Sequence, residues 1–218
     1  MKIIDDIEIV SEINNIDYLS SIELMEIKVS KIQLNKANEL IWFLNYDHMY
    51  TVGASGNENE LKHLTEIPFY KTNRGGKITY HGPGQRIIYF IINLNKRKKD
   101  IRKFVNLIEN SAIKILRDFD IEARTFYDRV GIWVTKNKKI KLKKEEKIGA
   151  IGLRIKKWVT YHGLSFNLNT NLKFYNDIDA CGLKNYSSTS IKKLGVNLTQ
   201  EEFDKIYLKE FLKGLKEL

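Results

Sequence analysis

The stretch from Val130 to Leu168 limits the possible folds most strongly, because it holds three consecutive runs rich in Ile, Val, Tyr, Phe and Trp. Such runs are typical of β-strands. They cover Val130–Val134, Lys147–Ile155 and Val159–Leu168. The connections between them are polar, and a run of lysines and glutamates between the first two predicts a solvated hairpin turn. Short polar connections favour antiparallel pairing, so we expect an antiparallel meander.

Three other segments have the apolar spacing of amphipathic helices: Asp17–Lys36, Asp100–Phe119 and Thr199–Leu215. Asp17 is a plausible N-cap, and Thr199 with Glu202 has the spacing of a capping box. Further strands are expected at Leu40–Leu44, Gly76–Tyr80 and Arg86–Ile92. Helices at both ends and in the middle of the chain would then cover one sheet. The sequence therefore predicts the α+β class and a single domain over residues 1–218.

Composition excludes several classes of protein. Hydrophobic residues make up 43% and charged residues 29% of the 218 residues, which are globular values. The longest strongly apolar run, Ile87–Ile92, is far shorter than the roughly 20 residues of a membrane span. Acidic residues occupy the place where the apolar region of a signal peptide would lie. A single cysteine allows no internal disulfide, so we expect a cytoplasmic protein without membrane contact.

The four histidines have no HExxH or CxxC companions, so no zinc or other metal site is predicted. Thirty-seven basic and 27 acidic residues give a net charge of +10. This charge fits an acidic partner, but lysine is frequent along the whole chain, and a general compositional bias explains it equally well.

Four glycines within eleven residues stand out between positions 74 and 84. Glycine at this density indicates unusual backbone angles or close approach of a ligand. The pattern matches neither a phosphate-binding loop nor a dinucleotide fingerprint. Read without further context, it is a glycine-rich loop, a short strand and a Gly-Pro-Gly turn. The stretch reads Arg74-Gly75-Gly76-Lys77-Ile78-Thr79-Tyr80-His81-Gly82-Pro83-Gly84-Gln85.

A second stretch alternates small and large apolar residues along an expected strand. Its predicted faces are Gly149, Ile151 and Leu153 on one side, and Ile148, Ala150 and Gly152 on the other. Glycine inside a strand often marks close approach of another group to the backbone. Lys147 at its start is, taken alone, one lysine among many.

Two further features are a histidine–glycine pair and a lone cysteine. His162 precedes Gly163 inside the third run of the meander, where an isolated histidine is more often structural than catalytic. Cys181 follows two aspartates and precedes a glycine in an expected loop. A lone cysteine is usually a small buried apolar residue, whereas a loop cysteine beside a cation becomes a reactive thiolate.

Taken together and in order, these segments resemble the octanoyltransferases, also called lipoate–protein ligase B. The resemblance is carried by RGGKITYHGPGQ (74–85), KIGAIGLRIKKWVTYHGLSFNLNT (147–170) and ACGL (180–183), with support from GIWV (131–134) and YTVG (50–53). These residues cover about a third of the chain. The chain departs from the family at Ala180, where proline is more usual, and at Gly149, where alanine is more usual.

The resemblance implies the biotin/lipoate protein ligase catalytic-domain fold, a mixed sheet flanked by helices. It implies transfer of an octanoyl group from octanoyl-acyl carrier protein to a lysine of lipoyl domains, in 2-oxoacid dehydrogenases and the glycine cleavage H protein. By the same resemblance Cys181 is the catalytic nucleophile and Lys147 its catalytic partner. The substrate pocket would comprise Arg74, Gly75, Gly76, Lys77, Ile78, Thr79, Tyr80, His81, Ala150, Ile151, Gly152, Gly163, Leu164 and Ser165, with His162 shaping it.

This chemistry needs no cofactor. Exchange between two thioesters is nearly isoenergetic and amide formation from a thioester is downhill, so no ATP is required. The enzyme is expected to act as a monomer. Two alternatives remain. The nearer is an ATP-dependent lipoate or biotin ligase on the same fold, which would not need Cys181. The other is a basic nucleic-acid-binding protein, although no nucleic-acid-binding motif is present and nucleic acid is not expected as a partner.

Overall fold

The computed structural model describes residues 1–62, 65–178 and 186–218. The α-helices are α1 (Tyr18–Gln33), α2 (Ile101–Asp118) and α3 (Gln200–Leu215). The strands are β1 (Lys2–Ile4), β2 (Ile7–Asn15), β3 (Glu39–Asn45), β4 (Met49–Val52), β5 (Phe69–Lys71), β6 (Ile78–His81), β7 (Gln85–Ile91), β8 (Ile121–Arg124), β9 (Ile132–Asn137), β10 (Glu146–Lys156), β11 (Val159–Asn167) and β12 (Ser187–Ser188). Short 3₁₀ helices are η1 (Glu58–Glu60), η2 (Leu94–Lys96) and η3 (Leu172–Asp177).

A large mixed sheet organises the molecule. Its order is β1-β2-β3-β7-β11-β10-β9-β8, and β12 pairs in addition with β10. The predicted meander is confirmed, because β10 pairs antiparallel with both β9 and β11. The β2–β3 and β10–β12 pairs are parallel. Strands β5, β4 and β6 form a second, three-stranded sheet in that order.

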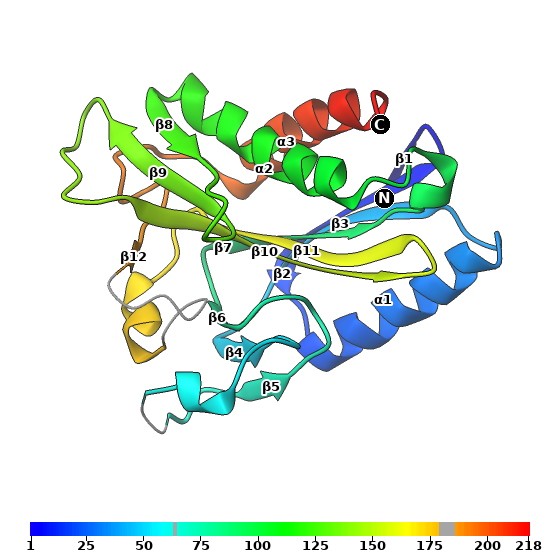
Figure 1. Ribbon diagram of the computed structural model, residues 1–218, viewed down its shortest axis with the longest axis horizontal. Helices are drawn as coiled ribbons and strands as arrows, with labels where there is room; N and C mark the ends of the chain where they lie inside the picture. The colour runs from blue at the N-terminus through cyan, green and yellow to red at the C-terminus, as the bar shows by residue number, and fades with distance from the viewer. Residues whose placement is uncertain (63–64, 179–185) are drawn as a thin grey trace.

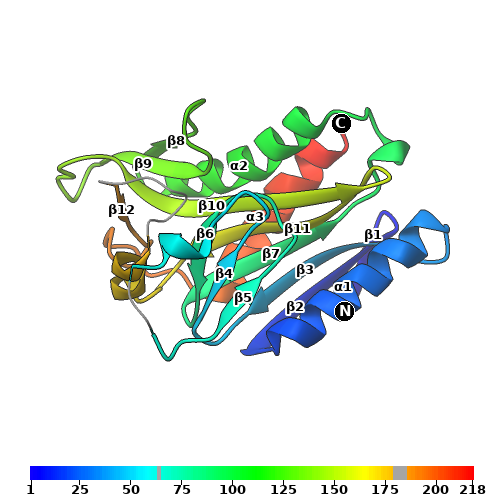
Figure 2. The ribbon, with the colours of Figure 1, turned by 60° about the horizontal axis from the view of Figure 1, so that its bottom comes forward.

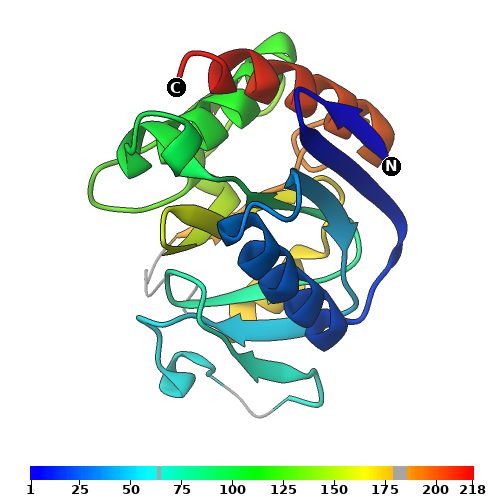
Figure 3. The same ribbon diagram turned by 90° about the vertical axis from the view of Figure 1, so that its right-hand side faces the viewer.

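The elements form layers on the two faces of the large sheet. Helices α2 and α3 lie side by side on one face, whereas α1 and the small sheet lie against the other face (Figure 1, Figure 3). Figure 2 shows β4, β5 and β6 in front of the large sheet and beside α1. The α+β class is therefore confirmed. The expectation of a single sheet is wrong, because β4 and β5 are too short to give a clear pattern in the sequence.

All three predicted helices are present, and side-chain caps explain where they begin. The carboxylate of Asp17 accepts a hydrogen bond from the backbone N–H of Ser20 at 2.8 Å. Asp100 caps α2 in the same way. Thr199 and Glu202 form the predicted capping box at the start of α3. Helix α1 ends earlier than expected, at Gln33, because Asn35 adopts a left-handed backbone with φ of 54°.

Only part of the apolar surface of α1 is buried. Met25, Val29 and Ile32 are buried against the sheet. Four other apolar residues of the predicted helix instead face solvent: Leu19, Leu24, Ile27 and Leu34. Within residues 1–62, 65–178 and 186–218, no helix or strand covers the outer side of α1 (Figure 3), so only one stripe of its surface is buried.

Strand β10 contains an irregularity where the sequence predicted simple alternation. Its pairing with β9 shifts register between Lys147 and Gly149. Ile148 is fully buried in the core beneath α2 and α3, and Ile151 and Leu153 pack against that same core. The prediction that Ile148 and Ile151 lie on opposite faces of the strand is therefore wrong. An extra residue in one strand changes which side chains share a face.

Candidate active site

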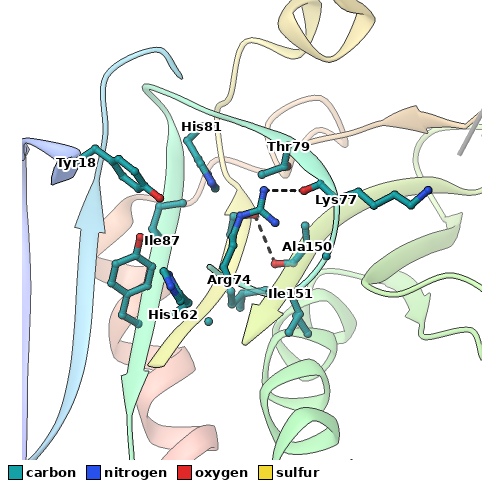
Figure 4. A pocket seen from close by; sticks show the side chains of 15 residues that line it. Tyr18, Arg74, Lys77, Thr79, His81, Ile87, Ala150, Ile151 and His162 are labelled. Carbon is teal, nitrogen blue, oxygen red and sulfur yellow. Dashed lines mark hydrogen bonds between the residues drawn. The ribbon is translucent and has the colours of Figure 1, made fainter. Parts of the chain in front are cut away.

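A cavity lies between the large sheet, the start of α1 and the glycine-rich loop before β6. It opens to solvent, and the space inside it together with that at its mouth is about 510 Å³. The residues that line it are Tyr18, Arg74, Gly76, Lys77, Thr79, His81, Ile87, Tyr89, Ala150, Ile151, Gly152, His162, Gly163, Leu164 and Ser165 (Figure 4). The structure thus brings three segments of the expected pocket together.

Three residues of the expected pocket are absent from this lining. Ile78 and Tyr80 are buried in a small apolar cluster with Tyr50 and Ile178. Gly75 lies at the edge of β10, where its backbone N–H donates to the carbonyl of Leu153 at 3.2 Å. This bond fastens the glycine-rich loop to the large sheet.

Arg74 holds the glycine-rich loop in shape. Its guanidinium donates to the carbonyls of Thr51 and Lys77 at 2.7 Å each and to the carbonyl of Gly75 at 2.9 Å. It also donates to the Thr51 hydroxyl. Figure 4 shows Arg74 at the centre of the cavity wall, with its bond to Lys77. The positive charge is therefore tied to backbone oxygens of β4 and of the loop, and it organises the wall.

The histidine–glycine pair on β11 has a geometric explanation. His162 has a left-handed backbone, with φ of 59°, which is uncommon for a residue other than glycine. Tyr161 and His162 consequently pack against each other and both reach the α1 side of the sheet. A Cβ at Gly163 would lie 2.1 Å from the carbonyl oxygen of Ile88, so this position needs glycine. Strained backbone of this kind is frequent at ligand sites.

The two histidines in the wall are neutral at ordinary pH. Burial, followed by the charge of Arg74, lowers the pKa of His81 to about 3. The same two causes lower the pKa of His162 to about 3. The His81 ring lies 2.7 Å from the side-chain oxygen of Gln85, and His162 lies 3.0 Å from that of Asn73. Both are suited to shape the cavity and donate hydrogen bonds, and neither is suited to carry a positive charge.

Lys147 occupies a second, smaller cavity that shares Thr79 and Ala150 with the first. The lysine is only 7% exposed. Its ammonium donates to the carbonyl of Val130 at 2.8 Å and lies 5.5 Å from the centre of the Trp133 ring. Gly131, with φ of 119°, leaves room for it, because a Cβ there would lie 2.5 Å from Lys147 Cε.

Cys181 lies outside the described residues, so its position relative to Lys147 stays a prediction. The chain on either side of it is described. Tyr175, six residues before Cys181, and Ser188, seven residues after it, both line the cavity that holds Lys147. Ser188 is also the parallel partner of Lys147 in the β10–β12 pair.

Several residues near the site were not singled out from the sequence. Tyr18, Ile87 and Tyr89 line the larger cavity. Burial raises the pKa of Glu109 on α2 to about 7, and the charge of Lys147 opposes that rise. Arg129 is buried beside Trp133. Arg129 lies two residues before the quoted GIWV motif, but nothing in the local sequence pointed to its role.

Metal and membrane features give no further site. Among residues 1–62, 65–178 and 186–218, no three His, Cys, Asp or Glu side chains are grouped as metal ligands. None of the helices in these ranges combines the length and apolar character needed to cross a membrane.

Comparison with known proteins agrees with this geometry. Residues 17–212 match the lipoyl protein ligase A/B catalytic domain. An octanoyltransferase of Wolbachia pipientis (strain wPip, from Culex pipiens) is 46% identical over 198 residues, which is 90% of this chain and 94% of the relative. The octanoyltransferase of Rickettsia conorii is 42% identical over 204 residues, 92% of this chain and 95% of the relative.

Solved structures share the fold at low sequence identity. A lipoate-protein ligase A bound with ATP superimposes with a TM-score of 0.71 at 15% identity, covering 95% of this chain and 85% of the other. An archaeal bi-partite lipoate protein ligase from Thermoplasma acidophilum gives a TM-score of 0.70 at 13% identity, with 95% and 83% coverage. The chain belongs to the lipoyl protein ligase A/B catalytic-domain family, and within that family it belongs to the octanoyltransferases.

Proposed function

We propose that this chain, as a single catalytic domain over residues 1–218, moves an octanoyl group from octanoyl-acyl carrier protein to a lysine of a lipoyl domain through a thioester on Cys181. The chain is an acyltransferase of protein lipoylation, as its octanoyltransferase relatives are. The donor, the thioester and the roles of Cys181 and Lys147 are what the proposal adds.

The carrying observation is that the small cavity holding Lys147 is lined by chain from both sides of Cys181. Tyr175 precedes the cysteine and Ser188 follows it, and both contribute to this cavity. Because residues on both sides of Cys181 in the sequence line this cavity, we expect the Cys181 thiol to lie close to the Lys147 ammonium. Because the same cavity shares Thr79 and Ala150 with the larger one, an acyl group bound there would have its carbonyl near Lys147.

In the first half-reaction the Cys181 thiolate attacks the thioester carbonyl of the donor. The new sulfur–carbon bond forms, the bond to the carrier sulfur breaks, and the carrier leaves as a thiolate that takes up the proton of the Lys147 ammonium. Lys147 is then neutral at the start of the second half-reaction. A free cysteine has a pKa of about 8.5, so only a few per cent is thiolate at neutral pH. An ammonium held beside the thiol increases this fraction by favouring the charged form.

In the second half-reaction the lysine amine of the lipoyl domain attacks the acyl-Cys181 thioester. An amide bond forms, and the Cys181 sulfur leaves with the bonding electrons. The attacking amine must lose a proton, which neutral Lys147 can accept as a general base. Lys147 then returns to the ammonium form that stabilises the restored thiolate.

The larger cavity suits a medium-length acyl chain. Ile87, Ala150 and the ring of Tyr89 supply apolar surface, and the neutral histidines add no charge. Burying six methylenes and a methyl stabilises binding by roughly 5 kcal/mol at about 0.8 kcal/mol per carbon, before the cost of ordering the chain.

The protein partners follow from the chemistry. Lipoyl domains as acceptors and a carrier protein as donor fit the family in general, and acidic proteins of both kinds would be steered by the net charge of +10. We expect association to weaken with added salt. The single cysteine, which the reaction needs reduced, fits a cytoplasmic site of action.

The test is a complete reaction with octanoyl-acyl carrier protein and a lipoyl domain, with and without ATP. We expect octanoylation of the domain lysine without ATP, and its loss in Cys181→Ala. A reaction that requires ATP and free octanoate, and that survives Cys181→Ala, would identify an ATP-dependent ligase instead.

A further inference from the structure

Arg129 is a buried cation with no part in the reaction described above. It lies in the segment that leads into β9 and is 7% exposed. Its guanidinium lies 3.7 Å from the centre of the Phe126 ring, 4.7 Å from Trp133 and 4.6 Å from Tyr186. Three aromatic rings therefore surround one positive charge.

The surroundings of Arg129 do not fully compensate its burial. The Glu145 carboxylate is 3.6 Å away and belongs to a partly exposed side chain. The buried Nε has no hydrogen-bond partner in the described part of the chain. A buried guanidinium with an unsatisfied donor is costly, and the ring contacts recover part of that cost. An apolar side chain would fill such an aromatic pocket without the desolvation cost of a buried charge. Packing alone therefore does not explain an arginine at this position.

The same short segment also holds the Lys147 ammonium in place. The residue after Arg129 supplies the carbonyl that accepts the Lys147 hydrogen bond. Trp133, which lies against the Arg129 guanidinium, also lies 5.5 Å from the Lys147 ammonium. The indole N–H of Trp133 in turn donates to the carbonyl of Arg129 at 3.3 Å. The Trp133 ring is thus held by both the side chain and the backbone carbonyl of Arg129, and the Val130 carbonyl belongs to the next residue of the chain.

Arg129 also contacts the chain that follows the catalytic cysteine in sequence. Tyr186 is the first described residue after Cys181, and its ring meets Trp133 edge-on at 5.0 Å and 70°. One guanidinium therefore links the wall that holds Lys147 to the chain that leaves the Cys181 segment.

We propose that Arg129 is a positioning residue for the acyl transfer, which holds the Val130 carbonyl and the Trp133 ring where they seat the Lys147 ammonium. The proposal rests on the function proposed above, because it takes Lys147 to be the group that acts on Cys181. Arginine suits the place because its planar cation can lie against several rings at once, which a lysine ammonium cannot do.

The first experiment measures how well the Lys147 ammonium is held, and it does not rely on catalysis. The protein is acetylated briefly with acetic anhydride, and the modification of Lys147 is measured by peptide mass spectrometry against exposed lysines of the same molecule. We expect Arg129→Leu to raise the relative rate at Lys147 by about fivefold or more, since a held ammonium loses its hydrogen bond. Arg129→Lys should give an intermediate value, and it serves in place of Arg129→Leu if that variant does not fold.

Arg124 provides a matched control. It is an exposed arginine whose guanidinium lies 5.2 Å from the centre of the same Phe126 ring, and no cation–ring contact joins it to Trp133 or Tyr186 among the described residues. Arg124→Leu should leave the labelling of Lys147 unchanged.

The second experiment is a double-mutant cycle on the rate of octanoyl transfer. We expect Arg129→Leu to lower kcat by tenfold or more, with the KM for the donor changed by less than twofold. In a Lys147→Ala background the same substitution should lower kcat by less than twofold, because the group that Arg129 positions is gone. Unchanged labelling of Lys147, or losses that multiply independently in the double variant, would overturn the proposal. A Lys147→Ala variant with full activity would instead contradict the proposed function, whereas the labelling result would still decide whether Arg129 holds Lys147.

Discussion

The two faces of the large sheet use the same strands for different purposes. On β7 and β11 the side chains of Ile88, Phe90, Leu164 and Phe166 contribute to the core beneath α2 and α3. Their neighbours face the other way, toward α1 and the small sheet, where the larger cavity lies. The first face is mostly aliphatic and aromatic, and two buried charges on it, Arg86 of β7 and Asp204 of α3, are paired with each other. The second face carries tyrosine hydroxyls, two neutral histidines and a guanidinium that is bonded to backbone carbonyls.

The contrast shows how stability and chemistry are separated within one sheet. The side beneath α2 and α3 is closed by a ring cluster in which Phe90 and Phe211 lie 4.7 Å apart. The opposite side keeps a solvent-open cavity and strained backbone at His162. Free energy gained by packing on the first side offsets the polar and strained features on the second. Substitutions on the two sides should therefore change different quantities.

The largest effect is expected on the open side, at Lys147. Replacing it with alanine removes both the cation beside the thiol and the proton acceptor. We expect kcat for octanoyl transfer to fall by about 10²–10⁴-fold, with the melting temperature nearly unchanged. Steady-state kinetics and thermal melting check this, and Lys144→Ala on the exposed β9–β10 loop is the control. A variant that retains full kcat would show that the open side does not use this lysine.

On the closed side, Phe211→Ala should mainly change stability. Phe211 is fully buried and contacts the rings of Phe90, Phe104 and Tyr207. Its loss leaves a cavity and should lower the free energy of unfolding by about 3–5 kcal/mol. The transfer rate per folded molecule should stay within about twofold. Urea unfolding and kinetics on the same samples test this, and an unchanged stability would contradict the assignment of the core.

Gly163→Ala tests the close approach of β11 to β7 next to the left-handed backbone of His162. The new Cβ would meet the Ile88 carbonyl at 2.1 Å, which the backbone can relieve only by moving. We expect a loss of about 2–3 kcal/mol in unfolding free energy. Gly214→Ala on α3 is the control, because its Cβ would meet only a terminal methyl of Leu107, and alanine favours a helix. Equal effects of the two substitutions would contradict the role given to Gly163.

The last effect, absent at neutral pH and growing as the pH falls, concerns the neutral histidines of the open side. Their pKa is about 3 in the folded chain, against an ordinary value of 6.5. Below pH 6.5 the unfolded chain therefore binds protons that the folded chain does not. The free energy of unfolding should fall as the pH is lowered from 6.5 toward 3, by up to about 1.4 kcal/mol per pH unit for each histidine.

His162→Asn isolates one of these contributions, because asparagine tolerates the left-handed backbone that this position requires. The variant should show a shallower dependence of unfolding free energy on pH over the same range. Urea unfolding at several pH values measures it. An unchanged slope would mean that His162 is protonated in the folded protein.

The sequence predicted the parts of the fold that depend on local pattern. The caps at Asp17 and Thr199 and the β9–β11 meander were predicted from residue type and spacing alone. It did not predict β4 and β5, because three or four residues give no clear period. The register shift after Lys147 was also missed, since a bulge depends on the partner strand rather than on the strand's own residues.

Part of the candidate site was likewise predicted from the sequence, and part of it was missed. The glycine-rich loop and the Ala150–Gly152 and Gly163–Ser165 segments were selected by resemblance, and the structure brings them around one cavity. Tyr18 was missed because it begins a helix that looks purely structural. Arg129 was missed because its meaning comes from three rings, one of them 57 residues later at Tyr186, and from the lysine on the next strand. Contacts between distant segments have no local sequence signal.

The central claim is that Cys181 carries the acyl group. Its most direct test is the intact mass of the protein after brief incubation with octanoyl-acyl carrier protein, without ATP and without a lipoyl domain. The account predicts a gain of one octanoyl group that hydroxylamine removes, that Cys181→Ala lacks, and that a lipoyl domain added afterwards takes up on its lysine. Octanoylation of the lipoyl domain by Cys181→Ala at the wild-type rate would contradict it.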